Sequence, residues 1–347
     1  MGGLARRASV IDKYRDPDNG LVVVDVGDSL VSKGAARQAP LVKGNLITAR
    51  TMLKALGAMD VHALVPGELD LAPGLGWLKK TAAAEKVPLL GANLRVRGRA
   101  ALPSHRVVDT GGVKVGLLGL VDHSDVGEHH QPILKRNKVK TTDPAAAARA
   151  GVKALQKAGA QLVVVLGHMS LVKARALAAK VPGIHLMVLG HDGGRMAEPQ
   201  RSGKTYIVEA GQRGRELGHI QLRLGQGWDG TQPLTDDSRR YALYKDAVEV
   251  EKTLRARLAE QKPAERGTGL EASITRAKHL NEQYRKLPAS TGKHLLVSTL
   301  VSLGNEVPAN ATINGLVKGG QALLRKAASS GGGPRSVHMI PAQVRLK

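Results

Sequence analysis

The sequence predicts an α/β fold in which buried strands form a layered sheet covered by helices. Two observations lead to this prediction. First, short runs rich in β-branched and other aliphatic residues alternate with segments of helical periodicity over the first two thirds of the 347 residues. Second, these runs are largely apolar along their length, which is typical of strands buried on both faces. Hydrophobic residues make up 42% of the chain, which is enough for a substantial core.

Eight runs are predicted strands because each is short, apolar and bounded by segments with turn residues. The third run contains Pro88, which cannot donate a ladder hydrogen bond, so we expect it at a strand start or on a sheet edge. The eight predicted strands are Leu21–Val26, Val61–Val65, Val87–Leu90, Val113–Leu120, Leu162–Leu166, His185–Leu189, Thr205–Val208 and His219–Leu224.

Helices are predicted between several of these strands from apolar residues at helical spacing. Thr142 and Asp143 form a cap for the third helix, and Pro144 takes its first position, where a missing N–H costs nothing. The predicted helices are Asn45–Leu56, Leu75–Lys86, Pro144–Ala158 and Leu171–Ala179.

The pattern changes after Trp228, where a glycine-containing loop interrupts the alternation of strand and helix. The segment Tyr241–Glu260 is predicted to be an amphipathic helix, which we interpret as a packing element with a solvated basic face. A helix, a strand and a last helix are predicted at Glu271–Arg285, Leu295–Leu300 and Ala311–Lys326. We therefore expect an α/β domain at 1–228, a small, mainly helical extension at 229–328 and a flexible basic tail at 329–347.

Composition narrows the classes of function. The chain has no cysteine, so any metal must be held by nitrogen and oxygen ligands. Its net charge of +23 is spread along the whole sequence, which favours attraction to phosphorylated ligands over a localised nucleic-acid footprint. Aromatic residues make up only 2%, too few for platforms that stack single-stranded bases. No run approaches the ~18 apolar residues that a membrane-spanning helix needs. We therefore expect a small phosphorylated ligand, with no membrane span and no dedicated nucleic-acid binding.

Polar residues follow four of the predicted strands at the points where these strands end. They are Gly27-Asp28, Pro66–Asp70, Gly167-His168 and Gly190-His191. Ligands of such sheets collect past the carboxyl ends of the strands, so we expect these side chains at one edge of the fold. A lone Gly-Asp is also typical of a turn, but two strands that both end in Gly-His favour a site. Imidazole and carboxylate ligands suit Zn, Mn or Fe.

The order and spacing of these motifs resemble the calcineurin-like metallophosphoesterase family, and most closely its 5′-nucleotidase branch. The family motifs run Asp-x-His, Gly-Asp, Gly-Asn-His-(Asp/Glu), Gly-His and Gly-His-x-His. The resemblance implies a four-layer α/β/β/α sandwich and a metal-dependent hydrolase of small phosphorylated compounds such as nucleotides. It covers roughly residues 1–225 and includes Gly2–Arg7, Leu56–Val61, Leu90–Leu94, Gly112–Leu120, Ile207–Gly211 and Leu217-Gly218.

Carried over position by position, the resemblance implies that Asp28, His168 and His191 are metal ligands, with Asp28 in the place of the carboxylate that bridges two metals. Glu68 and Asp70 are predicted to bind substrate, and they could also supplement the metal from the third motif. Asn93 follows an apolar strand, where it could contact substrate or cap a turn.

The chain also departs from the family motifs. No Asp-x-His precedes Gly2, the Asn position of the third motif is Pro66, the catalytic His position is Gly67, and the second His of the last motif is Gly193. Three retained ligands can hold one divalent ion but not two, so we expect at most one and assign no catalytic residue. Two hypotheses follow: a weak phosphoesterase with a degenerate metal site, and a non-catalytic binding or interaction module.

A further polar cluster, Asp122-His123 with Glu128–His130, follows the predicted strand at 113–120. It has metal-binding potential, but we interpret it as a solvated loop.

The segment Gly2–Arg7 is similar to the part of the family that directly follows the Asp-x-His motif. We therefore expect upstream codons for a strand ending in Asp-x-His, often after a secretory signal peptide, and in that case a periplasmic or extracytoplasmic location. A true start at Met1 would leave the metal site incomplete.

Overall fold

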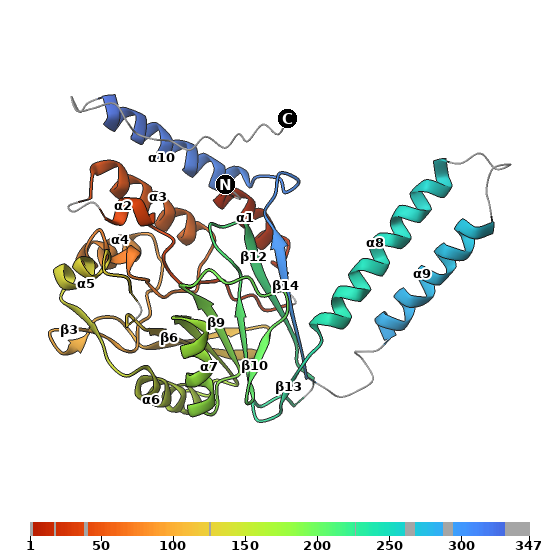
Figure 1. Ribbon diagram of the computed structural model, residues 1–347, viewed down its shortest axis with the longest axis horizontal. Coiled ribbons are helices and arrows are strands. Elements are labelled where there is room, and N and C mark those ends of the chain that lie inside the picture. Colours follow the sequence, from red (N-terminus) through yellow and green to blue (C-terminus); the bar gives the residue numbers. More distant parts are fainter. Residues whose placement is uncertain are drawn as a thin grey trace. The chain divides into compact units, whose positions relative to one another are not determined.

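The computed structural model describes residues 3–16, 19–37, 41–124, 126–225, 227–260, 268–286 and 294–329 (Figure 1). The predicted basic tail beyond Ser329 and the position of Gly2 lie outside this range. The contacts of the chain divide it into two compact units. The first comprises Met1–Met196, Gln200–Leu217 and Val301–Lys347, and the second comprises Ala197–Pro199 and Gly218–Leu300.

The first unit is built on a six-stranded sheet with the order β10-β11-β9-β8-β6-β5. Its four central strands run parallel, so their carboxyl ends lie at one edge. The two edge strands, β5 and β10, are antiparallel to their neighbours. The bounds are β5 (His105–Thr110), β6 (Val113–Val121), β8 (Leu162–His168), β9 (Leu186–Gly190), β10 (Gln200–Ser202) and β11 (Thr205–Glu209).

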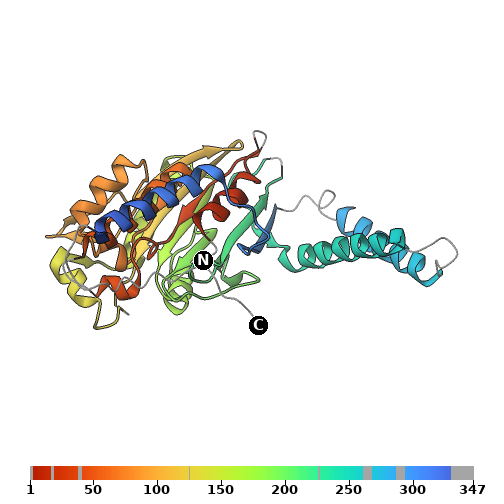
Figure 2. The same ribbon diagram turned by 90° about the horizontal axis from the view of Figure 1, so that it is seen from above.

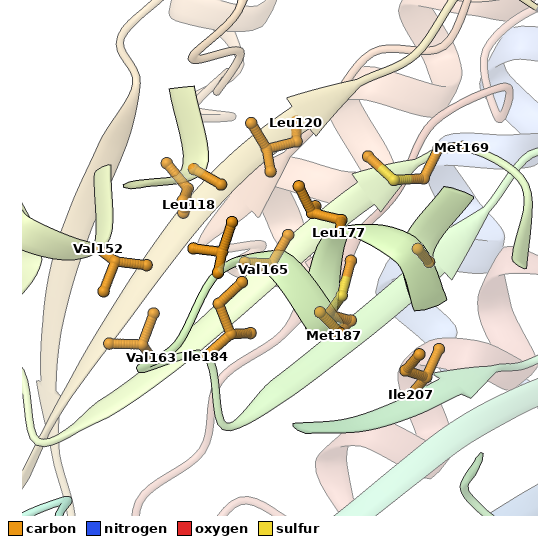
Figure 3. Packing of buried hydrophobic residues seen from close by; sticks show 14 of the residues in the cluster. Leu118, Leu120, Val152, Val163, Val165, Met169, Leu177, Ile184, Met187 and Ile207 are labelled. Atoms are coloured by element: carbon orange, nitrogen blue, oxygen red, sulfur yellow. The ribbon is translucent and has the colours of Figure 1, made fainter. Parts of the chain in front are cut away.

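Helices α6 (Pro144–Lys157) and α7 (Leu171–Lys180) cover this sheet with small and branched aliphatic side chains. Leu177 of α7 and Val152 of α6 belong to one buried cluster with strand residues such as Val165 (Figure 3). As predicted, Asp143 caps α6, because its carboxylate accepts hydrogen bonds from the N–H groups of Ala145 and Ala146. The mixed α/β fold predicted from the sequence is therefore confirmed.

A second, much smaller sheet pairs β1 (Val24–Asp25) with β2 (Ala63–Leu64) in parallel. The predicted strands over 21–26 and 61–65 thus contribute only two paired residues each, and the predicted third strand, with Pro88, makes a single bridge from Leu89 to Leu64. The helical elements of this part of the chain are α1 (Leu4–Asp12), α2 (Lys33–Ala36), α3 (Lys43–Ala58), the 3-10 turn η1 (Leu69–Leu71), α4 (Leu75–Ala84) and α5 (Gln131–Asn137). A three-stranded sheet of order β4-β3-β7 is formed by β3 (Leu94–Val96), β4 (Arg99–Ala100) and β7 (Val139–Thr141).

The last described helix, α10 (Ala311–Ser329), belongs to the first unit, where it packs against α3 and α1. Its Gly320 lies against Thr51 of α3, so that a Cβ at this position would come within 2.5 Å of the Thr51 hydroxyl oxygen. From the sequence we expected this helix in the C-terminal extension, because the contact with α3 joins distant parts of the chain. The boundaries after residues 228 and 328 remain proposals.

The second unit contains a sheet of order β12-β14-β13 and a pair of long helices that lie side by side (Figures 1 and 2). The strands are β12 (Glu216–Arg223), β13 (Leu234–Asp236) and β14 (His294–Ser302), and the helices are α8 (Ser238–Glu260) and α9 (Thr268–Lys286). Ile274 and Ala277 of α9 are buried, whereas Leu243 and Val250 of α8 are about half exposed. No helix in the described part of the chain combines the length and the apolar character needed to cross a membrane.

Candidate metal centre

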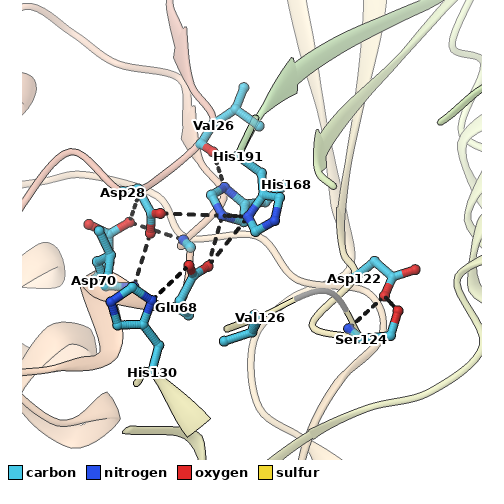
Figure 4. A network of polar contacts seen from close by, with 12 residues as sticks. Val26, Asp28, Glu68, Asp70, Asp122, Ser124, Val126, His130, His168 and His191 are labelled. Carbon is cyan, nitrogen blue, oxygen red and sulfur yellow. Dashed lines mark hydrogen bonds and ion pairs between the residues drawn. The ribbon is translucent and has the colours of Figure 1, made fainter. Parts of the chain in front are cut away.

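Four side chains from two sheets converge at the carboxyl ends of their strands (Figure 4). Asp28 follows β1, Glu68 follows β2, His168 ends β8, and His191 directly follows β9. Each offers one ligand atom, and the four atoms lie within 4.8 Å of one another. The structure thus brings together the three predicted metal ligands and adds Glu68, which from the sequence was expected to bind substrate and could also supplement the metal.

Four of the separations within this cluster are close to those around one small divalent ion. The Nε2 atom of His168 lies 3.1 Å from Oε2 of Glu68, 3.3 Å from Nδ1 of His191 and 3.7 Å from Oδ2 of Asp28. Nδ1 of His191 is also 3.7 Å from Oε2 of Glu68. Metal–ligand bonds of ~2.1 Å in tetrahedral geometry place neighbouring ligand atoms about 3.4 Å apart. Two imidazoles and two carboxylates are also a donor set that Zn, Mn and Fe accept.

His168 is fixed in the orientation that a ligand needs. Its side chain is fully buried, and its Nδ1–H donates a 2.7 Å hydrogen bond to the carbonyl of Val26, which leaves Nε2 facing the cluster. Burial lowers the pKa of His168, but the hydrogen bond to Glu68 and the nearby Asp28 carboxylate outweigh it and raise that pKa to about 9. The same contact holds the pKa of Glu68 well below its usual range, against the opposing effect of burial. Without a cation, a proton on His168 therefore balances the negative charge of the Glu68 and Asp28 carboxylates.

Asp70 lies behind the cluster and serves the backbone. It is fully buried, and its carboxylate accepts hydrogen bonds from three N–H groups, those of Asp28 (2.7 Å), Leu30 (2.9 Å) and Gly67 (3.0 Å). Burial and the neighbouring Asp28 carboxylate raise the pKa of Asp70 to about 7. Both of its oxygens are engaged with these N–H groups, so Asp70 positions the backbone of the two loops, and the substrate contact expected from the sequence stays a prediction.

Two glycines let the loops after β1 and β2 approach each other. A Cβ on Gly27, where φ is 87°, would lie 2.4 Å from the nitrogen of Gly67. A Cβ on Gly67 would lie 2.1 Å from Oδ1 of Asp28 and 2.5 Å from Cε1 of His168. The position where the family motif has its catalytic His therefore has no room for a side chain in this packing.

His191 adopts a backbone conformation that L-residues rarely occupy, with φ of 104°. Gly190 before it packs closely on the first loop, because a Cβ there would lie 2.7 Å from the carbonyl oxygen of Val26. Backbone strain of this kind persists where the surrounding structure enforces it, and it concentrates at functional sites. The strain is consistent with a side chain held toward the cluster.

The loop after β6 is solvated only in part: Glu128 and His129 are exposed, as the sequence predicted, but two of its imidazoles are buried. His123 is only 6% exposed and His130 only 9% exposed. Nδ1 of His130 lies 3.7 Å from Oε1 of Glu68, on the other side of that carboxylate from His168 (Figure 4). His130 precedes α5, which is tied to the third-motif loop because the Asn137 side chain donates to the carbonyl of Leu71 and accepts from the N–H of Leu75. His123 comes just after β6, and His168 is the last residue of β8. A histidine at the end of an apolar strand was therefore visible in the sequence for both residues.

Asn93 is fully buried. Its side-chain amide donates to the carbonyls of Val121 (2.6 Å) and Thr142 (3.0 Å), and its oxygen accepts from the N–H of Val121 (3.0 Å). These bonds connect β3 to the end of β6. Asn93 is thus engaged in supporting the strand exits, and of the two roles left open by the sequence the structural one fits its contacts.

Comparisons with known proteins agree with this description. No family model matches the chain. A snake venom 5′-nucleotidase from Crotalus adamanteus is 26% identical over 200 residues, which cover 55% of this chain and 32% of that protein. The chain thus spans about a third of the length of this relative, and the sequence match supports the resemblance to the 5′-nucleotidase branch.

Two solved structures share the fold. The sulfate thiohydrolase SoxB of Thermus thermophilus aligns with a TM-score of 0.65 at 15% identity, over 94% of this chain and 48% of that chain. A 5′-nucleotidase precursor from Thermus thermophilus aligns with a TM-score of 0.62 at 16% identity, over 95% of this chain and 54% of that chain. These neighbours confirm the metallophosphoesterase fold predicted from the motifs.

Proposed function

We propose that this relative of the 5′-nucleotidase branch of calcineurin-like metallophosphoesterases is a weak, metal-dependent phosphoester hydrolase of small phosphorylated compounds. The single observation that supports the proposal best is the convergence of Asp28, Glu68, His168 and His191 at one point of the fold. The relatives support a nucleotide as the type of substrate.

In this proposal the four side chains hold one divalent cation. When bound, such an ion lowers the pKa of a coordinated water to about 7 and polarises a phosphoryl oxygen. The chain supplies the rest: the Val26 carbonyl holds His168 in the ligating tautomer, and Asp70 holds the backbone of the Asp28 and Gly67 loops in place. The two carboxylates of Asp28 and Glu68 match the charge of a divalent ion.

Activity is proposed to be weak because the third motif lacks two functional side chains. Pro66 offers no ligand for a second ion, and Gly67 offers no acid to protonate the leaving group. A single ion cannot clamp both the attacking and the leaving oxygen. Substrates with good leaving groups, such as aryl phosphates, should therefore react faster than nucleotides.

The alternative is a non-catalytic module that keeps the fold for ligand binding or interaction. The same substitutions at 66, 67 and 193 favour it, since they remove groups that the family motifs use for chemistry. It predicts neither metal-dependent turnover nor an effect of cluster substitutions on phosphate ester hydrolysis.

The deciding experiment is calorimetric titration of Mn²⁺ and Zn²⁺ into the wild type, His191→Ala and a control, His129→Ala, whose imidazole is exposed. We expect one ion per chain, with affinity about 10-fold to 100-fold lower in His191→Ala only. The same proteins are then assayed with p-nitrophenyl phosphate and a nucleoside monophosphate. Two ions with fast nucleotide turnover would contradict the degenerate site, and no metal binding would leave the non-catalytic module.

A further inference from the structure

The loop after β6 carries two buried imidazoles, those of His123 and His130, that are not among the four grouped metal ligands. We propose that His123, supported by His130, forms the phosphoryl-binding wall of the site, donating a hydrogen bond to an anionic oxygen of the substrate or product. This inference rests on the proposed function and deepens it, since it names the groups that would recognise the phosphoryl group.

His123 has hydrogen-bonding groups that the described residues leave unused. Its side chain is buried, yet neither ring nitrogen has a hydrogen-bond partner among the described residues, and the same holds for Nε2 of His130. An imidazole carries at least one N–H in either tautomer, and leaving it unpaired away from water costs free energy. Buried polar groups without a partner are rare, and a ligand that completes their hydrogen bonds is one explanation for them.

The sheet register directs His123 to the edge where the cluster lies. Val121 of β6 pairs with His168 of β8, and the N–H of Asp122 donates to the carbonyl of His168 at 3.0 Å. His123 comes next in the chain, and its ionisation is sensitive to the charges of His168, Glu68 and His191. The chain therefore leaves the sheet beside the cluster with an unpartnered imidazole.

His130 borders the same region from the third-motif side. Its Nδ1 faces Oε1 of Glu68 at 3.7 Å, which leaves Nε2 as its unpartnered nitrogen among the described residues. His130 directly precedes α5, and α5 is held in place because its Arg136 and Asn137 side chains donate hydrogen bonds to carbonyls of the η1 region. His123 and His130 thus add hydrogen-bond donors beside the cluster of Asp28, Glu68, His168 and His191.

An anionic oxygen fits this wall better than a second cation. The carboxylate nearest in sequence, Asp122, accepts through Oδ1 from the N–H of Ser124 (2.9 Å) and from Nζ of Lys173 (3.2 Å), and it makes no hydrogen bond to either ring nitrogen of His123. Burial lowers the pKa of His123 to about 4, which keeps the ring neutral near pH 7. A neutral imidazole N–H aimed at developing negative charge stabilises it without transferring its proton.

The wall would also replace part of what Gly67 lacks. A His at position 67 would approach the phosphoryl group from the third-motif loop, but the contacts of Gly67 with Asp28 and His168 leave no space for it. His123 would approach from the β6 loop, where the sequence places an imidazole and the fold buries it. It would bind and orient the phosphoryl group, and the leaving group would remain without a proton donor.

The test compares His123→Leu, which removes the donor, with His123→Gln, which keeps an N–H, and with His129→Gln, an exposed control in the same loop. Calorimetry first measures Mn²⁺ affinity and then the affinity of the Mn²⁺-loaded proteins for orthophosphate. We expect Mn²⁺ affinity within about threefold of wild type in all variants. Orthophosphate affinity should fall by roughly 10-fold to 100-fold in His123→Leu, which is the range for a lost hydrogen bond to a charged group, and should be partly restored in His123→Gln.

Two results would overturn the inference while leaving the proposed function intact. Unchanged phosphate affinity in His123→Leu would exclude the wall, and a loss of Mn²⁺ affinity in both His123 variants would identify His123 as a metal ligand. If the wild type binds no Mn²⁺, the proposed function fails, and orthophosphate is titrated into the metal-free proteins. Binding that depends on His123 supports the wall even then, and absence of binding refutes it.

Discussion

The two sides of the candidate metal centre are built by different means. On one side, His168 and His191 emerge from β8 and β9, strands of seven and five residues inside a six-stranded sheet. On the other, Asp28 and Glu68 follow strands of two residues each, and the buried carboxylate of Asp70 holds the intervening backbone through three hydrogen bonds. The positions of metal ligands can therefore be set by hydrogen bonds between strands, as for His168 and His191, or by one buried side chain, as for Asp28 and Glu68. In the second case the stability of the loops depends largely on that one residue, Asp70.

The largest effect is expected from Asp70→Ala, which would break the loop side only. Three buried N–H groups would lose their acceptor, and at about 1–3 kcal/mol each the free energy of unfolding should fall by at least ~3 kcal/mol. Metal affinity should fall with it. Urea unfolding and Mn²⁺ calorimetry measure both quantities.

The control for this substitution is Asp143→Ala, because Asp143 also accepts two backbone N–H bonds but does so at the exposed start of α6. There we expect a loss of only ~1 kcal/mol and unchanged metal affinity. Equal losses in the two variants would mean that Asp70 is an ordinary cap and that the loop side has other supports.

The next effect concerns pH and distinguishes two imidazoles at the same sheet edge of the metal-free protein. His123 has its pKa lowered from about 6.5 to about 4, so its contribution is present above pH 6.5 and is lost as the pH falls toward 4. His168 has its pKa raised to about 9, so its contribution is present below pH 6.5 and is lost as the pH rises toward 9. Each shift corresponds to about 3 kcal/mol.

Urea unfolding of the wild type and of each variant between pH 4 and 9 should show the two contributions as differences in the free energy of unfolding from the wild type, because the pKa of Asp70, raised to about 7, adds its own loss of stability as the pH rises from about 4 to about 7. Relative to the wild type, His123→Gln should lose less stability as the pH falls from 6.5 to 4, and His168→Gln should lose less as the pH rises from 6.5 to 9. A profile in which neither substitution changes its own limb would contradict the assigned charge states.

The smallest effect is expected from Gly67→Ala, which tests how tightly the two sides are fitted together. The added methyl group meets Asp28 and His168, so both ligands must shift, and we expect metal affinity to fall about 10-fold to 100-fold. Gly76→Ala in α4 is the control, since a Cβ there meets nothing within 4 Å, and it should be neutral or stabilising by up to ~1 kcal/mol. Unchanged affinity in Gly67→Ala would show that the loops are compliant.

The same contrast explains which parts of the site were predictable from the sequence. A continuous apolar strand followed by Gly-His is a local pattern, and β8 and β9 place His168 and His191 where that pattern predicts. For Glu68 and Asp70 the pattern gives two acidic residues in one turn but not their directions. One faces the imidazoles and the other faces the backbone, a difference set by packing with a loop some 40 residues away in the chain.

The burial of His130 could not be predicted from the sequence, because His130 precedes α5, and α5 is tied to the distant η1 region by Asn137 and Arg136. The position of α10 beside α3 is a contact between distant parts of the chain for which chain order offers no signal. Contacts between distant parts of the chain of this kind determine the position of each site residue whose role looks different in the structure than in the sequence. Their roles as metal ligands or phosphoryl donors stay predictions until the titrations are made.

The space at Gly67 also has an evolutionary consequence. Because Asp28 and His168 occupy the volume that a side chain at 67 would need, a single substitution of Gly67 by His would first displace the ligands that it is meant to serve. An acid at position 67 can be accommodated only if the loop after β1 has moved first. The effect of a substitution at 67 therefore depends on an earlier, compensating substitution, which is epistasis. Directed evolution for faster turnover should accordingly find its first gains at other positions, and mutations at 67 should become beneficial only in backgrounds that have already moved Asp28.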